Sequence, residues 1–222
     1  MFQIKICGIT SVDDALAVVR AGADAIGLNF YPRSPRYVSL DLARQIVAAL
    51  PREIVKVGLF VNASSSDVRR FYDQLLLDVI QLHGDESPEY LAELRGWPVM
   101  RAFRVEPGKL RSTIEYLARC REIEATPQFA MIDTLVVGVY GGTGKTADWT
   151  AAGEYAARVG LPPLVLAGGL VPENVGEAIR TVRPAAVDVA SGVESRPGQK
   201  DPAMVEAFVR AARAAFSQQN RL

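Results

Sequence analysis

Histidine and cysteine are scarce in this chain. Its 222 residues include a single histidine, His83, and two cysteines, Cys7 and Cys120, which lie in unrelated local contexts. These residues form no metal-ligand spacing, so we expect no metal site. So few cysteines without a pairing pattern are typical of a reduced, cytoplasmic protein.

The chain also lacks an excess of charge and a long hydrophobic run. Lys and Arg together number 25, as do Asp and Glu, so the formal net charge is zero. We therefore expect no nucleic-acid partner and no membrane partner. No apolar run approaches the roughly 20 residues that cross a bilayer. Because a strand-like segment begins within a few residues of Met1, we also expect no secretory signal.

The composition that remains is that of a globular protein with a large core. Hydrophobic residues make up 49% of the chain and charged residues 23%. No linker, low-complexity tract or charge run interrupts it. We therefore expect one domain over residues 1–222, a length that a single α/β barrel commonly occupies.

Short apolar runs alternate with helical patterns from end to end. Strands are expected at residues 2–7, 24–29, 54–61, 78–83, 98–104, 128–133, 163–168 and 185–190. Helices are expected at about 11–21, 39–49, 64–75, 86–94, 109–119, 148–159, 172–181 and 201–216. Ser11, Ser39 and Ser64 are placed to cap helices, and Pro172 suits the first turn of the seventh.

Strict alternation of strands and helices is typical of a parallel sheet with right-handed crossovers. Eight such units favour an α/β TIM (βα)8 barrel of eight parallel strands in a single domain. An open doubly wound sheet is the alternative, although no glycine-rich dinucleotide fingerprint follows the first strand.

In a barrel the chemistry lies in the loops after the C-terminal ends of the strands. The unusual residues of this chain cluster there: Cys7, residues 29–37, His83, Arg104, Asp133, residues 141–146, Gly168, Gly169 and residues 191–194. The sequence thus predicts one active site at this end of the barrel.

A thiol and a carboxyl group end two of the expected strands. Lys5 and Cys7 point to the same side of the first strand, and the ammonium group favours the reactive thiolate. Asp133 ends the sixth strand, where partial burial favours the protonated form that donates a proton. Together they would supply a base and an acid for isomerisation by proton transfer. The alternatives are a buried cysteine that only fills space and an aspartate that forms a turn.

Two further polar residues belong to this predicted site. Arg36 lies in a loop stiffened by Pro32 and Pro35, and a guanidinium group held in this way suits bidentate binding of a carboxylate. His83 is interpreted as a wall of the site and not as the proton carrier.

Three glycine-containing segments follow the last three expected strands. They are residues 140–146, 166–170 and 190–194. Glycine lets several backbone N–H groups point at one anion, and barrels often bind phosphate at the loops after the seventh and eighth strands. A nucleotide P-loop at Gly144-Lys145-Thr146 fails on spacing, since Val139 stands where that motif needs glycine.

The chain closely resembles the phosphoribosylanthranilate isomerase family along its whole length. The resemblance is carried by residues 5–10 (KICGIT), 34–38 (SPRYV), 60–62 (FVN), 81–84 (QLHG), 141–144 (GGTG), 166–170 (LAGGL), 172–175 (PENV), 188–189 (DV) and 191–194 (SGVE). It implies a TIM barrel that catalyses an Amadori rearrangement of N-(5-phosphoribosyl)anthranilate, a step of tryptophan biosynthesis, without metal or organic cofactor. A monomer is expected, as the commoner mesophilic form of the family.

The resemblance also implies the roles of individual residues. Cys7 would be the general base, Asp133 the general acid, and Arg36 the partner of the anthranilate carboxylate. The other substrate-binding residues would be His83, Gly142, Gly144, Gly168, Gly169, Asp188, Ser191 and Gly192. Ala147 and Ala190 depart from the family, which often has phenylalanine and serine there.

Two other kinds of function remain open at this point. One is another phosphate-binding barrel enzyme, including a histidine-pathway isomerase that runs the same rearrangement with two carboxylates. The other is a non-catalytic phosphosugar-binding barrel. Cys7 at the end of the first strand argues against the histidine-pathway isomerase but leaves dual specificity open. Cys7 and Asp133 together argue against the non-catalytic barrel.

Overall fold

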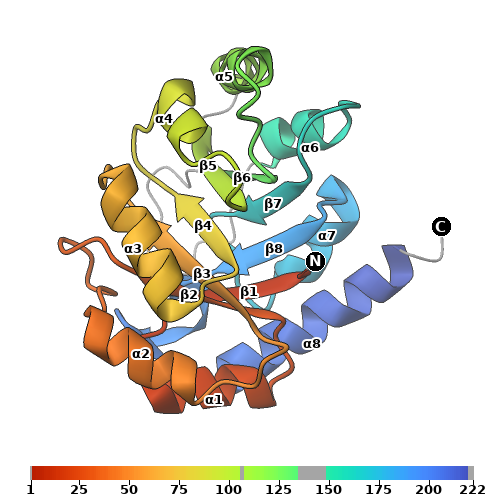
Figure 1. Cartoon of the computed structure of the whole chain (residues 1–222). Helices are drawn as coiled ribbons and strands as arrows, with labels where there is room; N and C mark the ends of the chain where they lie inside the picture. Colours follow the sequence, from red (N-terminus) through yellow and green to blue (C-terminus); the bar gives the residue numbers. More distant parts are fainter. Residues whose placement is uncertain (1, 106–107, 135–148, 220–222) are drawn as a thin grey trace.

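The computed structural model describes residues 2–105, 108–134 and 149–219. Within them, eight parallel strands close into one barrel in chain order, which confirms the predicted TIM barrel (Figure 1). The strands are β1 (Ile4–Cys7), β2 (Ala25–Asn29), β3 (Val55–Phe60), β4 (Val79–Leu82), β5 (Val99–Val105), β6 (Phe129–Thr134), β7 (Leu164–Ala167) and β8 (Ala186–Val189).

The helices alternate with these strands and surround the barrel (Figure 1). They are α1 (Val12–Arg20), α2 (Leu40–Ala48), α3 (Ser65–Leu75), α4 (Pro88–Glu93), α5 (Leu110–Glu122), α6 (Thr150–Ala156), α7 (Val175–Val182) and α8 (Pro202–Gln219). None of the described helices is long and apolar enough to cross a membrane.

Helix starts follow the capping residues in the first part of the chain. Ser11, Ser39 and Ser64 each accept a hydrogen bond from the N–H three residues later, as predicted. The predicted start of the seventh helix at Pro172 is wrong, because α7 begins at Val175. The side chain of Asn174 accepts from the N–H of Val171 and donates to the carbonyl of Gly169, which keeps this segment a loop.

Two apolar layers hold the barrel together. The larger lies between strands and helices, and the smaller fills the barrel itself. The inner cluster consists of Phe2, Ala25, Val57, Val79, Met100, Ala102, Phe129, Met131, Val165, Ala167 and Ala186. Beside it lie the buried polar side chains of Lys5, Gln81 and Asp188. Because buried polar groups need partners and stabilise the fold less than apolar ones, this polar layer is where we expect the functional site.

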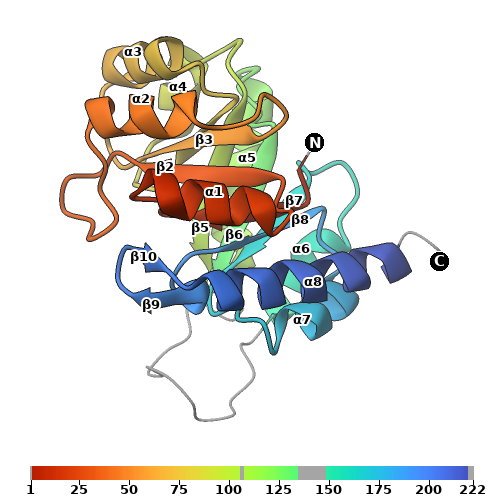
Figure 2. The same cartoon turned by 90° about the horizontal axis from the view of Figure 1, so that it is seen from below.

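The barrel closes where β1 pairs with β8, and Lys5 faces Asp188 in register across that seam. After β8 the chain forms a short 3-10 helix, η1 (Ser191–Val193), and a hairpin of β9 (Glu194–Arg196) and β10 (Gln199–Lys200), which the sequence did not predict. Figure 2 shows this hairpin next to the start of α8. The hydroxyl of Thr10 donates to the carbonyl of Gly198 and so ties the hairpin to the loop after β1.

Candidate active site

The predicted base and acid end strands on two sides of the barrel mouth. Cys7 is the last residue of β1, and Asp133 lies near the end of β6, with β7 and β8 between them in the barrel. Cys7 is 5% exposed, whereas the Asp133 side chain is 30% exposed. Acid and base therefore approach the barrel mouth from separate strands.

A buried ion pair lies beside the thiol. Nζ of Lys5 is 2.7 Å from Oδ1 of Asp188, and Lys5 is fully buried. Burial alone would lower the pKa of Lys5, but Asp188 and Cys7 together outweigh burial and raise it. Lys5 therefore keeps its proton and stands as a fixed cation next to Cys7. The predicted role of Asp188 in substrate binding stays a prediction, and one of its oxygens is occupied by Lys5.

The expectation that the thiolate is favoured needs correction. Burial raises the pKa of the Cys7 thiol, and Lys5 opposes this shift without cancelling it. The sequence argument counted the Lys5 cation, but it did not count the nearby Asp188 carboxylate, which also raises the Cys7 pKa. The thiolate of Cys7 is thus a stronger base than an ordinary thiolate.

A glycine makes room for this cluster. A methyl group on Gly27 of β2 would lie 2.7 Å from Sγ of Cys7 and 2.9 Å from Nζ of Lys5. Both distances are shorter than van der Waals contact allows. The absence of a side chain at Gly27 therefore lets the thiol and the ammonium group lie over β2.

Arg36 reaches the site from the loop after β2 and is held by a carboxylate of the chain itself. Nε of Arg36 lies 2.8 Å from Oε1 of Glu194, and Nη2 lies 2.6 Å from Oε2. Lys200 donates to the same Glu194 at 2.7 Å and to the carbonyl of Ala190 at 3.0 Å. The sequence analysis assigned the guanidinium group of Arg36 to a substrate carboxylate. Its Nε and Nη2 already donate to Glu194, so a ligand would bind at Nη1.

His83 follows β4 and lies against the predicted acid. Its Nε2 is 3.3 Å from Oδ2 of Asp133, and its side chain is 16% exposed. The other ring nitrogen, Nδ1, is 3.1 Å from Nε2 of Gln81, a fully buried residue of β4. The interpretation of His83 as a wall of the site is therefore incomplete, because the imidazole connects Gln81 with Asp133.

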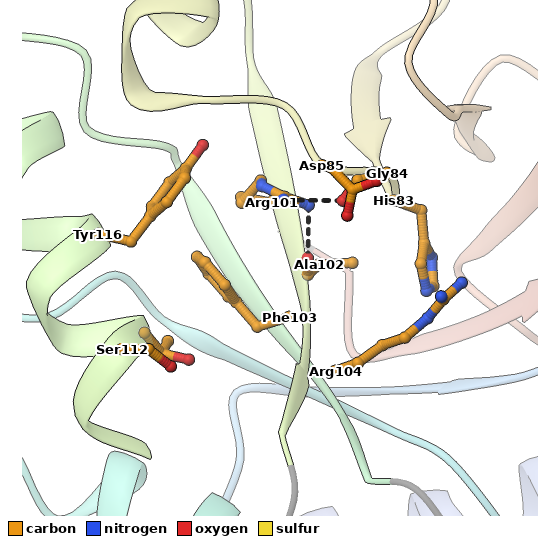
Figure 3. A pocket seen from close by; sticks show the side chains of 10 residues that line it. His83, Gly84, Asp85, Arg101, Ala102, Phe103, Arg104, Ser112 and Tyr116 are labelled. Atoms are coloured by element: carbon orange, nitrogen blue, oxygen red, sulfur yellow. Dashed lines mark hydrogen bonds between the residues drawn. The ribbon is translucent and has the colours of Figure 1, made fainter. Parts of the chain in front are cut away.

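The backbone around His83 is held by Arg101 of β5. Nη1 of Arg101 donates to the carbonyl of Leu82 at 3.1 Å, and Nη2 to the carbonyl of Gly84 at 2.9 Å. A cavity of about 270 Å³ opens beside these groups. Figure 3 shows that His83 and Arg104 point toward each other at one edge of this cavity.

The glycine loops after β7 and β8 lie side by side, as the pairing of these strands requires. Gly168 and Gly169 have φ of +89° and +64°, which side chains rarely adopt. A methyl group on Gly192 would collide with the carbonyl oxygen of Leu170, so the two loops touch at this point. Ser191, exposed at the start of η1, belongs to the same edge. Gly142 and Gly144, and with them the first of the three predicted segments (residues 140–146), lie outside the described residues.

Sequence reasoning missed four residues of this site: Gly27, Gln81, Glu194 and Lys200. Gln81 and Glu194 stand in the quoted motifs, but nothing in a single sequence assigned them a partner. Gly27 interrupts an apolar strand, a signal for close approach of another group. Among the described residues, no group of three or more His, Cys, Asp and Glu side chains is placed to hold a metal ion.

Comparisons with known proteins give one consistent result. The family model described as N-(5'-phosphoribosyl)anthranilate (PRA) isomerase matches residues 4–211. N-(5'-phosphoribosyl)anthranilate isomerase of Pseudomonas fluorescens is 47% identical over 211 residues, which cover 94% of this chain and 97% of that protein. The enzyme of the same name from Azotobacter vinelandii is 49% identical over 210 residues, which cover 94% and 96%.

Solved structures agree with the sequence relatives. The crystal structure of phosphoribosyl anthranilate isomerase from Thermotoga maritima superposes with a TM-score of 0.84 at 40% identity and covers 96% of this chain and all of that one. A second structure of this enzyme, in complex with reduced 1-(o-carboxyphenylamino)-1-deoxyribulose 5-phosphate, gives 0.82 at 36% identity and the same coverage. This chain belongs to the N-(5'-phosphoribosyl)anthranilate isomerase family.

Proposed function

We propose that the chain catalyses the Amadori rearrangement of N-(5-phosphoribosyl)anthranilate to 1-(2-carboxyphenylamino)-1-deoxyribulose 5-phosphate, a step of tryptophan biosynthesis. The observation that carries this function is the pair formed by a buried thiol at the end of β1 and a part-exposed carboxyl group near the end of β6. Membership of the family supports it. So does the complex of a related enzyme with a reduced form of this product.

In the proposed mechanism Asp133 acts first, as the general acid. Its proton passes to the ring oxygen of the ribose, the bond from that oxygen to C1 breaks, and a Schiff base forms with the anthranilate nitrogen. The imine makes the proton on C2 acidic, because the electrons left behind are delocalised toward the nitrogen. The acid therefore prepares the carbon at which the base acts.

Cys7, in its thiolate form, then removes the proton from C2 as the general base and becomes the thiol. The product of this step is an enolamine, which tautomerises to the ketone. The raised pKa of the Cys7 thiol suits this role, since a stronger base removes a carbon-bound proton more readily. Lys5 stabilises the thiolate form, because it acts on Cys7 both by charge and by hydrogen bond.

The two ends of the substrate are bound by groups other than the acid and the base. The anthranilate carboxylate meets the Nη1 side of Arg36, which Glu194 leaves open. The phosphate lies at the adjoining loops that contain Gly168, Gly169 and Gly192. Attachment at both ends places C1 and C2 between acid and base and lowers the entropic cost of reaction.

The wider setting follows from the same proposal. The enzyme acts as one domain over residues 1–222, on a small molecule, in the cytoplasm and without a cofactor. Two free cysteines, Cys7 and Cys120, support a reducing compartment. General acid and base catalysis alone accounts for each proton that the rearrangement moves.

A fluorescence assay tests the proposed function. Phosphoribosylanthranilate is formed from anthranilate and a phosphoribosyl donor, and its fluorescence is followed after addition of the purified protein. Loss of the signal is expected with the wild-type protein and not with Cys7→Ala. A phosphosugar-binding barrel without activity would leave the signal unchanged and would refute the proposal.

A further inference from the structure

The side chain of Gln81 has no role in the mechanism above, yet it is fully buried inside the barrel. Its Nε2 lies 3.1 Å from Nδ1 of His83 and 3.4 Å from Sδ of Met131. Its Oε1 is buried and has no hydrogen-bond partner among the residues that the structure describes. A buried amide that is half-satisfied calls for an explanation, because an apolar residue would fill the same space at lower cost.

The contacts determine how the amide is oriented. In the orientation of the structure the NH2 group faces an imidazole nitrogen and a thioether sulfur, and both of these atoms are able to accept hydrogen bonds. With the amide reversed, the oxygen would face the sulfur, which has no proton to give, and two N–H donors would lie where Oε1 now has no partner. The observed orientation leaves one acceptor unpaired, and it is the better of the two.

The amide orientation determines the tautomer of His83. Because Gln81 donates to Nδ1, that nitrogen carries no proton, and the proton of the neutral ring is on Nε2. Nε2 is the atom that lies 3.3 Å from Oδ2 of Asp133. Arg101 holds the carbonyl groups of Leu82 and Gly84, so the ring cannot turn away with its backbone.

We propose that Gln81 is a positioning residue that holds His83 as the Nε2–H tautomer, so that the imidazole donates to Asp133 and leaves the Asp133 proton for the substrate. In the other tautomer Nε2 would accept the Asp133 proton and withdraw it from the ribose oxygen. In the selected tautomer Nε2–H stabilises the carboxylate that remains after proton donation. The catalytic part of this inference rests on the proposed function, whereas the assignment of the tautomer rests only on the contacts of Gln81 and His83.

The single histidine makes the tautomer directly measurable. NMR of the isotope-labelled imidazole nitrogens reports which nitrogen carries the proton, and no other histidine overlaps the signal. In the ligand-free wild-type protein, at a pH where titration shows the ring to be neutral, we expect the proton on Nε2. A neutral ring with its proton on Nδ1 would overturn the proposal.

Two substitutions at Gln81 test the cause. In Gln81→Glu a carboxylate faces Nδ1 and draws a proton onto it, so the NMR signal of Nδ1 changes to the protonated form. In Gln81→Met the side chain keeps nearly the same length and donates nothing, so the tautomers mix. For both variants we expect kcat to fall about tenfold or more, within the range that general acid catalysis contributes, while KM changes less than about threefold.

Gln128→Glu is the matched control, because Gln128 is exposed before β6 and the same change there adds the same charge. It should leave the imidazole signals and kcat as in the wild type. If Gln81→Met folds and keeps both the Nε2–H tautomer and the wild-type kcat, the proposal is wrong. A wild-type protein without isomerase activity but with the proton on Nε2 would refute the proposed function and leave the tautomer assignment standing.

Discussion

At the scale of single residues, the site depends on how three buried ionisable groups, Lys5, Cys7 and Asp188, share a small space. Lys5 lowers the pKa of Cys7, whereas burial and Asp188 raise it, and the raising effects win. Alternation along β1 predicts that Lys5 and Cys7 share a side. It gives no information about Asp188, which comes from the far end of the chain and meets Lys5 only because the barrel closes.

This balance predicts opposite effects for two substitutions. Lys5→Met removes the cation that favours the thiolate, so the pKa of Cys7 should rise further. Asp188→Asn removes a negative charge and frees Lys5, so the pKa of Cys7 should fall. The measurement is the ultraviolet absorbance of the thiolate as a function of pH, with the Cys7→Ala spectrum subtracted to remove Cys120. Shifts in the same direction, or no shift, would contradict the account of the base.

At the scale of secondary-structure elements, the hairpin of β9 and β10 holds Arg36, the arginine proposed to bind the substrate carboxylate. Glu194 is the first residue of β9, and its carboxylate accepts hydrogen bonds from Arg36 and Lys200. Burial alone would raise the pKa of Glu194, but the hydrogen bonds from Arg36 and Lys200 outweigh it and hold the pKa below its ordinary value of 4.5. The hairpin therefore contributes a charged anchor at the pH of the cell.

Glu194→Gln tests this anchor. Arg36 should lose its fixed orientation, and KM for phosphoribosylanthranilate should rise about tenfold, with kcat changed less. Because the pKa of Glu194 is lowered on folding, its contribution to stability is present above pH 4.5 and is lost as the pH falls through the lower folded value. In Glu194→Gln the free energy of unfolding should therefore fall less between neutral and acidic pH than it does in the wild-type protein.

The control for Glu194→Gln is Glu206→Gln on the exposed side of α8. This change should leave both KM and the acid dependence as they are. An unchanged KM in Glu194→Gln would mean that Arg36 needs no anchor or binds no substrate.

The strands and most helices could be predicted because alternation and capping are local signals. The start of α7 could not, since Asn174 binds the loop before it and overrides the preference of Pro172. The hairpin was missed because its two strands are very short and polar, so their residues show no periodic pattern. Gln81 and Glu194 stand in motifs that the sequence shows. Apart from His83, however, their partners come from other strands and loops, and a single sequence does not tell which of these lie together.

At the scale of the whole molecule, the barrel presents little apolar surface to a second copy. In the part of the chain that the structure describes, the exposed large hydrophobic residues are Tyr37, Leu76 and Val159, which lie in three different connecting segments. Stable dimers bury far larger apolar areas. We therefore predict a monomer of 24.1 kDa. Sedimentation equilibrium checks this mass, and a dimer at micromolar concentration would contradict it.

The central claim is that a thiol on β1 and a carboxyl group on β6 act on one substrate from separate sides. The most direct test is the kinetics of Cys7→Ala and Asp133→Asn together with calorimetric binding of the reduced product analogue. The account predicts that kcat falls more than about a hundredfold in each variant, while the affinity for the analogue stays near the wild-type value. A variant that binds the analogue normally and keeps a kcat near that of the wild type would contradict the assignment of its residue.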